Sequence, residues 1–232
     1  MNYKAIENTI LHEDNHLLVI NKASNILVQG DRTGDESIVD IMKEFVKWKY
    51  DKPGNVFIGL AHRLDRPVSG ALILCKTSKA LTRINKAFKD NKVEKTYLAI
   101  SEQKSKKTSF DFQSYLLKNR DKNLVQSHLH ATTGAKQAFT RWHLIATSKH
   151  RFLYKVFPKT GRSHQIRVHL SVNNCTILGD LKYGAKKPLK DRSIALHCYQ
   201  MKLEHPVTKL DLIFTAPPPD KEHWKEFKSF LP

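Results

Sequence analysis

The sequence predicts an α+β fold with a mixed, mainly antiparallel central sheet. Candidate strands follow one another in groups along the chain, and few helices separate them. This order favours strands and helices in separate regions over a doubly wound parallel sheet, in which they would alternate. The chain has 232 residues, of which 40% are hydrophobic, enough for one sizeable core. We therefore expect a single domain over residues 1–232.

Apolar runs and helical periodicity define the expected elements of the N-terminal half. Buried strands are predicted at Leu17–Ile20, Val56–Leu60, Ala71–Cys75 and Thr96–Ile100. An amphipathic helix is predicted before the stop signal Asp51–Gly54, because apolar residues recur there at helical spacing. These residues are Ile38, Ile41, Met42, Phe45 and Val46.

A second amphipathic helix is predicted from Ser78 onward. Its inward residues are Leu81, Ile84 and Phe88. Its outward residues are basic, namely Lys79, Arg83, Lys86 and Lys89. Basic helix faces are usually solvated and nothing more. This one could also line a path for nucleic acid, because it directly follows the motif around Asp65 that is described below.

Strands joined by polar connections are expected in the C-terminal half. The basic stretches Ser101–Ser109 and Lys118–Lys122 are expected to be loops. Strands are predicted at Gln137–Leu144, Phe152–Phe157, Ile194–Cys198, Met201–Glu204 and Leu210–Thr215. A short helix is expected at His223–Phe230.

A formal net charge of +18 is the strongest feature of the composition. It indicates a polyanionic partner, of which nucleic acid is the simplest. The alternative partner is an anionic membrane surface. However, no segment forms an amphipathic helix with a large exposed apolar face. No apolar run approaches the roughly 18 residues that a membrane span needs.

Cysteine usage and the N-terminus predict a cytoplasmic protein. Cys75, Cys175 and Cys198 are odd in number, widely spaced and each in an apolar context. This predicts reduced core residues rather than disulfides or a zinc site. The N-terminal residues lack the apolar core of a secretion signal.

The segment Ala61–Gly70, AHRLDRPVSG, places one acid, Asp65, between two arginines and between two predicted strands. Pro67 and Gly70 predict a turn there. A carboxylate held between guanidinium groups on such a loop is a common way to present a functional acid. Taken alone, a segment of this kind is more often a surface ion-pair cluster in a hairpin.

A second polar segment, Thr160–Leu170, reads TGRSHQIRVHL and follows a predicted strand. With Ser163 as its N-cap, a helix begins here and Arg167 lies near its start. An arginine packed inward needs a carboxylate, because a buried unpaired charge is very costly. We predict that Asp65 is this partner.

Two histidines in the second segment, His164 and His169, raise the alternative of a metal site. They are five residues apart, so they do not share a helical face, and no nearby acid completes a ligand set. The zinc-deaminase, phosphate-loop and serine-elbow motifs are also absent from the sequence. We expect neither a metal nor a cofactor.

Four parts of the chain together resemble the RluA-type pseudouridine synthases. His62–Gly70 is similar to the catalytic motif of that family, and Lys95–Ala99 to its tyrosine motif. Thr160–Leu170 with Ile177–Gly184 resembles the third motif, and Leu196 and His197 before Leu203–Pro206 fit the closing strands. The resemblance runs from about Asn8 to Pro219, in the expected order.

The resemblance implies a pseudouridine synthase-like catalytic domain with a cleft along its sheet. We expect no separate S4-type RNA-binding domain, so the catalytic domain itself would hold the RNA. Lys22–Asn25 departs from the family pattern, since it reads Lys-Ala-Ser-Asn where the family has Lys-Pro-x-Gly. We expect that loop to be less rigid.

The implied reaction is isomerisation of a uridine within RNA, in which the N1–C1′ bond breaks and the base rejoins through C5. Asp65 would be the catalytic carboxylate, either attacking C1′ or removing a proton at C2′. Arg167 would keep Asp65 ionised. Tyr97 would stack on the detached base and assist proton transfer at C5.

The resemblance also implies a set of substrate-binding residues. Arg63 would fill the gap that the flipped base leaves in the stack. Leu196 would pack on the base from the side opposite Tyr97. The remaining expected contacts are Arg162, His164 and Gln165.

Two rival functions stand beside this one. A non-catalytic basic RNA-binding protein could have the same fold, although Asp65, Tyr97 and Arg167 are all present. A nuclease could use Asp65 with His62 or His164, but such nucleases usually need several convergent acids or a metal set. We expect ribosomal or transfer RNA as the partner, no membrane, and a monomer.

Overall fold

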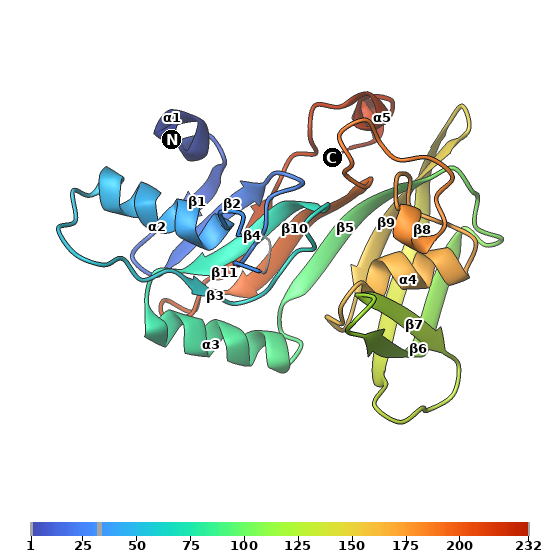
Figure 1. Cartoon of the computed structure of the whole chain (residues 1–232), viewed down its shortest axis with the longest axis horizontal. Coiled ribbons are helices and arrows are strands. Elements are labelled where there is room, and N and C mark those ends of the chain that lie inside the picture. The colour runs from blue at the N-terminus through green and yellow to red at the C-terminus, as the bar shows by residue number, and fades with distance from the viewer. Residues whose placement is uncertain (1, 32–33, 232) are drawn as a thin grey trace. The chain divides into compact units, whose positions relative to one another are not determined.

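A computed structural model describes residues 2–31 and 34–231 of the chain (Figure 1). The chain forms two compact units. Unit 1 consists of Met1–Glu94 and Cys198–Pro217, and unit 2 of Lys95–His197 and Pro218–Pro232. The single domain expected from the sequence stays a prediction.

Unit 1 is built on a mainly antiparallel sheet. β1 (Ile10–Glu13) pairs with β2 (Leu17–Lys22), and β2 pairs with β4 (Ser69–Cys75), both in antiparallel fashion. β10 (Leu196–Glu204) is the next strand beside β4 and pairs antiparallel with β11 (Asp211–Thr215). β4 is buried along its whole length, so it forms the centre of this sheet.

The described residues of unit 1 contain the helices α1 (Tyr3–Glu7), α2 (Ile38–Lys49) and α3 (Ser78–Lys89). The two long helices confirm the helices predicted from periodicity. Each begins at a hydroxyl N-cap, Ser37 for α2 and Thr77 for α3, whose side chain accepts a hydrogen bond from the first turn. In the described ranges no helix is long and apolar enough to span a bilayer.

Two details around the Asp65 loop differ from the expectation. Of the predicted strand Val56–Leu60, only β3 (Gly59–Leu60) pairs with β4. Phe57 is 46% exposed, so the segment lacks the continuous burial that its apolar letters suggest. Gly70 is not a turn residue but lies inside β4, whereas the turn is closed by a hydrogen bond from Val68 N to Asp65 O (3.0 Å).

Gly70 allows a close approach of two backbones. Its φ is +117°, and a Cβ at this position would lie 2.3 Å from the carbonyl oxygen of Cys198 in β10. Any side chain would therefore collide with backbone that cannot rotate away. The glycine that ends the segment Ala61–Gly70 thus has a packing role in the sheet that carries the Asp65 loop.

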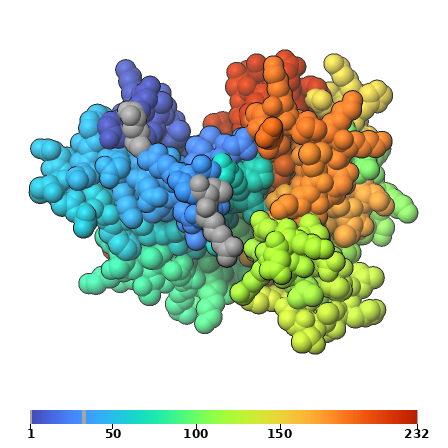
Figure 2. All heavy atoms as spheres, in the orientation of Figure 1, coloured from blue at the N-terminus to red at the C-terminus, as the bar shows by residue number. Residues whose placement is uncertain are grey.

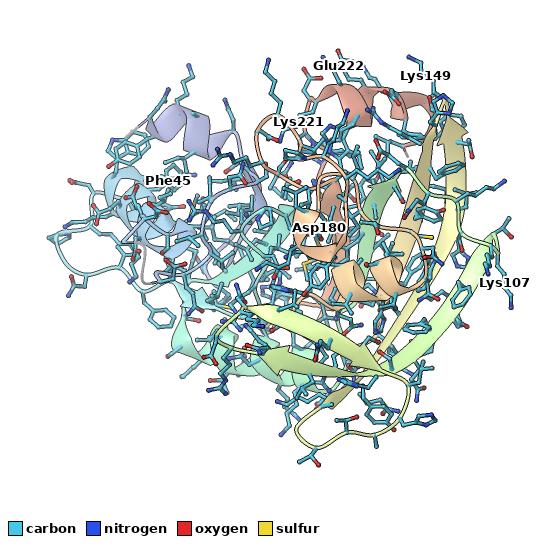
Figure 3. The ribbon with its side chains drawn as sticks, turned by 45° about the vertical axis from the view of Figure 1, so that its right-hand side comes forward. Phe45, Lys107, Lys149, Asp180, Lys221 and Glu222 are labelled. Carbon is cyan, nitrogen blue, oxygen red and sulfur yellow. The ribbon has the colours of Figure 1, made fainter. Side chains whose placement is uncertain are left out.

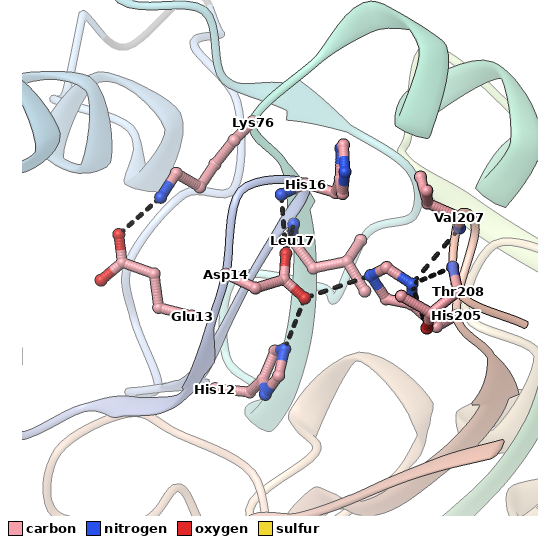
Figure 4. A network of polar contacts seen from close by, with 9 residues as sticks. All are labelled: His12, Glu13, Asp14, His16, Leu17, Lys76, His205, Val207 and Thr208. Atoms are coloured by element: carbon pink, nitrogen blue, oxygen red, sulfur yellow. Dashed lines mark hydrogen bonds and ion pairs between the residues drawn. The ribbon is translucent and has the colours of Figure 1, made fainter. Parts of the chain in front are cut away.

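Asp14 ties the β1–β2 turn to the segment between β10 and β11 (Figure 4). Its carboxylate accepts hydrogen bonds from the backbone N–H groups of His16 (2.6 Å) and Leu17 (2.7 Å) and lies 3.1 Å from His205 Nε2. Partial burial acts to raise the pKa of Asp14, but hydrogen bonds from His12, Leu17 and His16 outweigh it and lower this pKa to about 2. This turn therefore holds an ionised carboxylate at neutral pH.

Unit 2 contains a second run of antiparallel strands, in the order β5-β9-β8-β6-β7. Their bounds are β5 (Glu94–Ser101), β6 (Ser109–Asn119), β7 (Leu124–His128), β8 (Lys136–Ser148) and β9 (Arg151–Pro158). β5, β8 and β9 confirm predicted strands. The predicted loops Ser101–Ser109 and Lys118–Lys122 lie largely in the connections on either side of β6.

The helical elements of unit 2 are α4 (Gln165–Val172), α5 (Glu222–Lys225) and the 3-10 turns η1 (Leu181–Tyr183) and η2 (Lys228–Phe230). α4 lies against β7, β8 and β9. Val168 of α4 joins a small core with Leu116, Val125 and Ala138. The helix expected at His223–Phe230 is thus two short turns.

The predicted fold class is confirmed. Helices are few, the pairings named above are antiparallel, and strands predicted as separate at Ile194–Cys198 and Met201–Glu204 form the continuous β10. Cys75, Cys175 and Cys198 are buried, and none of the three is in a disulfide, as predicted. The predicted cleft along the sheet stays a prediction.

Candidate active site

Asp65 lies on the loop of unit 1 that joins β3 to β4, and its side chain is half-buried. The neighbouring apolar residues Leu64 and Val68 are 5% and 2% exposed, so they anchor the loop on the core. His62 accepts a hydrogen bond at Nε2 from Ile73 N of β4 (2.9 Å). The loop thus carries a half-buried carboxylate. Buried side chains before and after Asp65, together with the hydrogen bond to β4, hold the loop on the core.

The loop after β2 holds the backbone next to Asp65. Asn25 N donates to Arg66 O (2.7 Å), and Arg66 Nε donates to Asn25 O (3.2 Å). Asn25 has a φ of +71°, a conformation that asparagine tolerates better than most residues. It stands where the family that the chain resembles has glycine, a residue that also adopts a positive φ readily.

Lys22 is a buried cation near Asp65 that was not among the residues predicted for the site. Its side chain is 1% exposed. Its Nζ donates to the carbonyl oxygens of Ala23 (2.8 Å), Ile26 (3.0 Å) and Arg66 (3.4 Å). Burial lowers the pKa of Lys22 to about 7, although the charge of Asp65 raises it again in part. Lys22 could have been noticed because it begins the segment Lys22–Asn25, which differs from the family pattern. It was not predicted for the site because lysine is seldom buried.

Lys22→Met should change how stability depends on pH. In wild type, the pKa of Lys22 falls from 10.5 to about 7 on folding. Between these values the unfolded chain binds more protons than the folded one. The free energy of unfolding therefore rises with pH, by at most about 1.4 kcal/mol per pH unit. Without the amine this rise should disappear, which urea unfolding at several pH values between 7 and 10.5 would measure.

The matched control for this prediction is Lys4→Met, which removes an exposed lysine from the same unit. Its pH profile should keep the slope of wild type. If the profiles of Lys22→Met and wild type ran parallel above pH 7, the lysine would not change its protonation on folding.

Arg167 forms a buried bidentate ion pair with Asp180 (Figure 3 labels Asp180 beside α4). The distances are 2.7 Å from Nε to Oδ2 and 2.8 Å from Nη2 to Oδ1. The two side chains are 5% and 1% exposed. The carboxylate that a buried arginine needs is therefore present, thirteen residues further along the chain.

The predicted pairing of Arg167 with Asp65 stays a prediction. A guanidinium has five N–H donors, so the pair with Asp180 is compatible with a further acceptor. Asp180 lies in the segment Ile177–Gly184 that resembles the third family motif. Its role was missed because sequence alone does not say which acid an arginine meets in the fold.

Tyr183 of η1 fixes Arg167 and His164 together. The Arg167 guanidinium lies over the Tyr183 ring, 5.0 Å from its centroid. The Tyr183 hydroxyl accepts a hydrogen bond from Val125 N (3.0 Å) and lies 2.6 Å from His164 Nδ1. His164 and Arg167, at the start of α4, are thus held by the same residue of η1.

The start of α4 differs from the predicted N-cap. The cap is His164, with a φ of +51° and no side-chain capping bond, and not Ser163. Gln165 organises the turn instead: its Oε1 accepts from the Thr160 hydroxyl (2.8 Å) and Arg162 N (3.0 Å).

Gln165 is buried, and its amide is fully engaged within unit 2. Its Nε2 donates to Phe139 O and to Thr140 Oγ1, both at 2.9 Å, while its Oε1 accepts the bonds given above. We infer that it positions the Arg162–His164 turn. A direct contact of Gln165 with substrate stays a prediction.

The remaining predicted site residues lie on different elements. Tyr97 is half-buried in β5, opposite Val156 of β9. Leu196 begins β10 and is 3% exposed. Arg63 and Arg162 are exposed, and Arg162 Nε donates to Gln137 O (3.0 Å). The roles predicted for these residues stay predictions.

His164 and His169 do not form a metal site with each other. His169 is fully buried, with Nε2 3.0 Å from Ser114 Oγ and Nδ1 2.9 Å from Thr140 Oγ1. Burial lowers the pKa of His169 to about 4, so its ring is neutral at pH 7. Within residues 2–31 and 34–231 no group of His, Cys, Asp or Glu is arranged to hold a metal ion.

Comparison with known proteins agrees with these features. Residues 16–172 match the family model of RNA pseudouridylate synthase. The ribosomal large subunit pseudouridine synthase C of Buchnera aphidicola subsp. Schizaphis graminum is 32% identical over 221 residues, which cover 92% of this chain and 68% of that protein. Synthase C of Haemophilus influenzae is 31% identical over 218 residues, covering 91% and 66%. The chain thus spans about two thirds of the length of these relatives.

Solved structures show the same fold. Human RNA Pseudouridylate Synthase Domain Containing 4 superimposes with a TM-score of 0.81 at 24% identity, covering 99% of this chain and 95% of that one. Human RNA Pseudouridylate Synthase Domain Containing 1 gives a TM-score of 0.71 at 22% identity, covering 93% and 85%. With the family match over most of its length, this chain belongs to the RNA pseudouridylate synthase family and is an RNA pseudouridine synthase.

Proposed function

We propose that this enzyme isomerises specific uridines in ribosomal RNA, with Asp65 as its catalytic carboxylate. The observation that carries the proposal is the Asp65 loop itself. It presents one carboxylate within the family motif, beside the buried amine of Lys22 and on a backbone tied to two strands and a second loop. Such fixation is what a group acting at one atom of the ribose requires.

The reaction needs an ionised carboxylate at the ribose. Asp65 would either attack C1′, forming a covalent bond as N1 leaves, or remove a proton at C2′. A positive charge nearby favours the ionised form of an acid. Lys22 supplies such a charge in its protonated form, and Arg167 would supply a second one.

The other residues would hold the base and the RNA. Tyr97 would stack on the detached uracil and Leu196 would pack on its opposite face. Arg63 would occupy the vacated place in the base stack. Arg162 is exposed and His164 is half-buried at the start of α4. Gln165 accepts a hydrogen bond from Arg162 N, and Tyr183 contacts the His164 ring.

Large-subunit ribosomal RNA is the proposed substrate because the curated relatives are named for it. Transfer RNA is the alternative that the sequence left open. We also propose a cytoplasmic location, for which three buried cysteines outside any disulfide are typical. A monomer stays the expected assembly.

The test is incubation of purified protein with ribosomal and transfer RNA transcripts, followed by mapping of pseudouridine and of RNA length. We expect full-length ribosomal RNA with pseudouridine at one or a few positions. Shortened RNA would support the nuclease alternative, and bound but unmodified RNA would support the non-catalytic one. Either result, or modification of transfer RNA alone, would contradict the proposal.

A further inference from the structure

The outer face of α3 carries positive charge and no acid. The helix SKALTRINKAFK contains Lys79, Arg83, Lys86 and Lys89, and all four are exposed. Lys92 in the turn that follows is exposed too. Asp90, just beyond the helix, is the nearest acid in sequence, and it pairs with Lys86 at 2.9 Å. The face therefore keeps a net positive charge.

The other long helix of unit 1 shows that this is not a general feature of its helices. α2 also has 12 residues and three lysines, but it balances them with Asp40 and Glu44. In α3, moreover, Lys79 is the second residue of the helix, and the first turn holds no acid. A cation at this end opposes the helix dipole. The charge pattern of α3 is thus not the one that would best stabilise the helix.

The spacing of the basic residues suits a nucleic acid strand. Lys79, Arg83 and Lys86 are separated by four and three residues, so they lie on one face of the helix. They span about 10 Å along the axis at 1.5 Å per residue. This corresponds to roughly three nucleotides at a rise of about 3.4 Å. Thr82 and Asn85 lie between these basic residues in the sequence and are also exposed. Their side chains can form hydrogen bonds with phosphate or 2′-hydroxyl groups.

The inner face of α3 contacts the elements that hold the catalytic loop. The helix packs on β3 and β4, the strands on either side of Asp65. Phe88 of α3 lies against the ring of His62, with 4.8 Å between the ring centroids. Figure 1 shows α3 beside β3, and Figure 2 shows this segment at the surface of the molecule. RNA bound along α3 would therefore lie on the same unit as Asp65.

We propose that the outer face of α3 is a docking surface for the phosphate backbone of the substrate RNA, beyond the residues that contact the target uridine. The inference rests on the proposed function. An anionic membrane fits the surface less well, because the apolar face of α3, with Ala80 and Ile84, is buried on the sheet.

The test replaces Lys79, Lys86 and Lys89 together by glutamine and leaves Arg83, whose Nη1 donates to Pro206 O (3.0 Å). Binding to a transcript of large-subunit ribosomal RNA is measured over a range of salt concentrations. We expect the affinity at low salt to fall at least about tenfold and the log–log salt slope to decrease by about 2. The single-turnover rate at saturating RNA should fall much less than the affinity.

The matched control replaces Lys4, Lys43 and Lys47 by glutamine, which removes the same charge from α1 and α2 of the same unit. It should lose clearly less affinity. Equal losses in both variants, an unchanged α3 variant, or a loss confined to phosphatidylserine vesicles would overturn the inference. Since binding is read without turnover, a wild type that binds RNA through α3 but forms no pseudouridine would contradict only the proposed function.

Discussion

Asp65→Asn should fold, bind RNA and form no pseudouridine. The amide has nearly the shape of the carboxylate. However, it can neither attack C1′ as an anion nor act as the base that removes the proton from C2′. We expect the single-turnover rate to fall by at least about 100-fold, the lower bound for loss of a positioned acid–base group. The dissociation constant for the transcript should stay close to that of wild type, because phosphate contacts dominate binding.

The control for this prediction is Asp51→Asn, which makes the same chemical change at an exposed residue of the same unit. Asp51 has a φ of +45°, and asparagine adopts this conformation readily. The control should isomerise RNA at the wild-type rate. Substantial pseudouridine formation by purified Asp65→Asn would remove Asp65 from the mechanism.

The elements that the sequence predicted well are those whose burial follows a local period. The two long helices of unit 1 begin and end where their apolar spacing and their hydroxyl caps indicate. The strands β2 and β4 are nearly continuous apolar runs. Here local propensity and tertiary packing favour the same structure, so the sequence suffices.

Other elements were missed because polar residues occupy buried positions. No strand was predicted at Leu124–His128 or between Phe110 and Leu117, where β7 and β6 lie. Ser114 in β6 is fully buried and bonds His169 (3.0 Å) and Ser127 (2.7 Å). Its partners come from other elements, so the sequence shows a polar interruption where the fold has a core position.

The candidate site shows the same division. The motif around Asp65 was found because its letters are unusual and adjacent. Lys22 and Asp180 were not found, because their importance depends on burial and on partners far away in sequence. Buried charges are rare and need partners, so such residues become visible only when the fold shows what surrounds them.

Arg167→Met should strongly destabilise unit 2. It leaves the carboxylate of Asp180, 1% exposed, without its bidentate partner. Removing one member of a buried ion pair typically costs about 3–5 kcal/mol. Chemical denaturation would measure this loss as a lower midpoint with an unchanged slope.

Arg167→Lys separates charge from geometry. Lysine keeps the positive charge but cannot donate two parallel hydrogen bonds to Asp180 or lie flat on the Tyr183 ring. We expect this variant to be folded at room temperature but to lose most of its turnover at saturating RNA. Wild-type turnover would show that the direction of the guanidinium does not matter to the reaction.

A double-mutant cycle tests whether loss of the ion pair with Asp180 causes the destabilisation expected for Arg167→Met. Asp180→Asn alone removes the bidentate carboxylate that holds the buried guanidinium of Arg167, so it should also be strongly destabilising. The double variant Arg167→Met/Asp180→Asn contains neither charge of this ion pair. Its loss of stability should therefore be smaller than the sum of the two single losses by well over about 0.5 kcal/mol, the limit within which distant sites add.

The chain contains a matched control with the same geometry and the opposite burial. Arg141 and Asp111 form a bidentate pair at 2.6 Å and 2.9 Å on β8 and β6, but their side chains are 51% and 48% exposed. Water can replace either partner there, so Arg141→Met and Asp111→Asn should each leave the denaturation midpoint close to that of wild type. If both cycles gave the same small coupling, burial would not be what makes the Arg167–Asp180 pair important, and a structural role for Asp180 in holding Arg167 would have to be rejected.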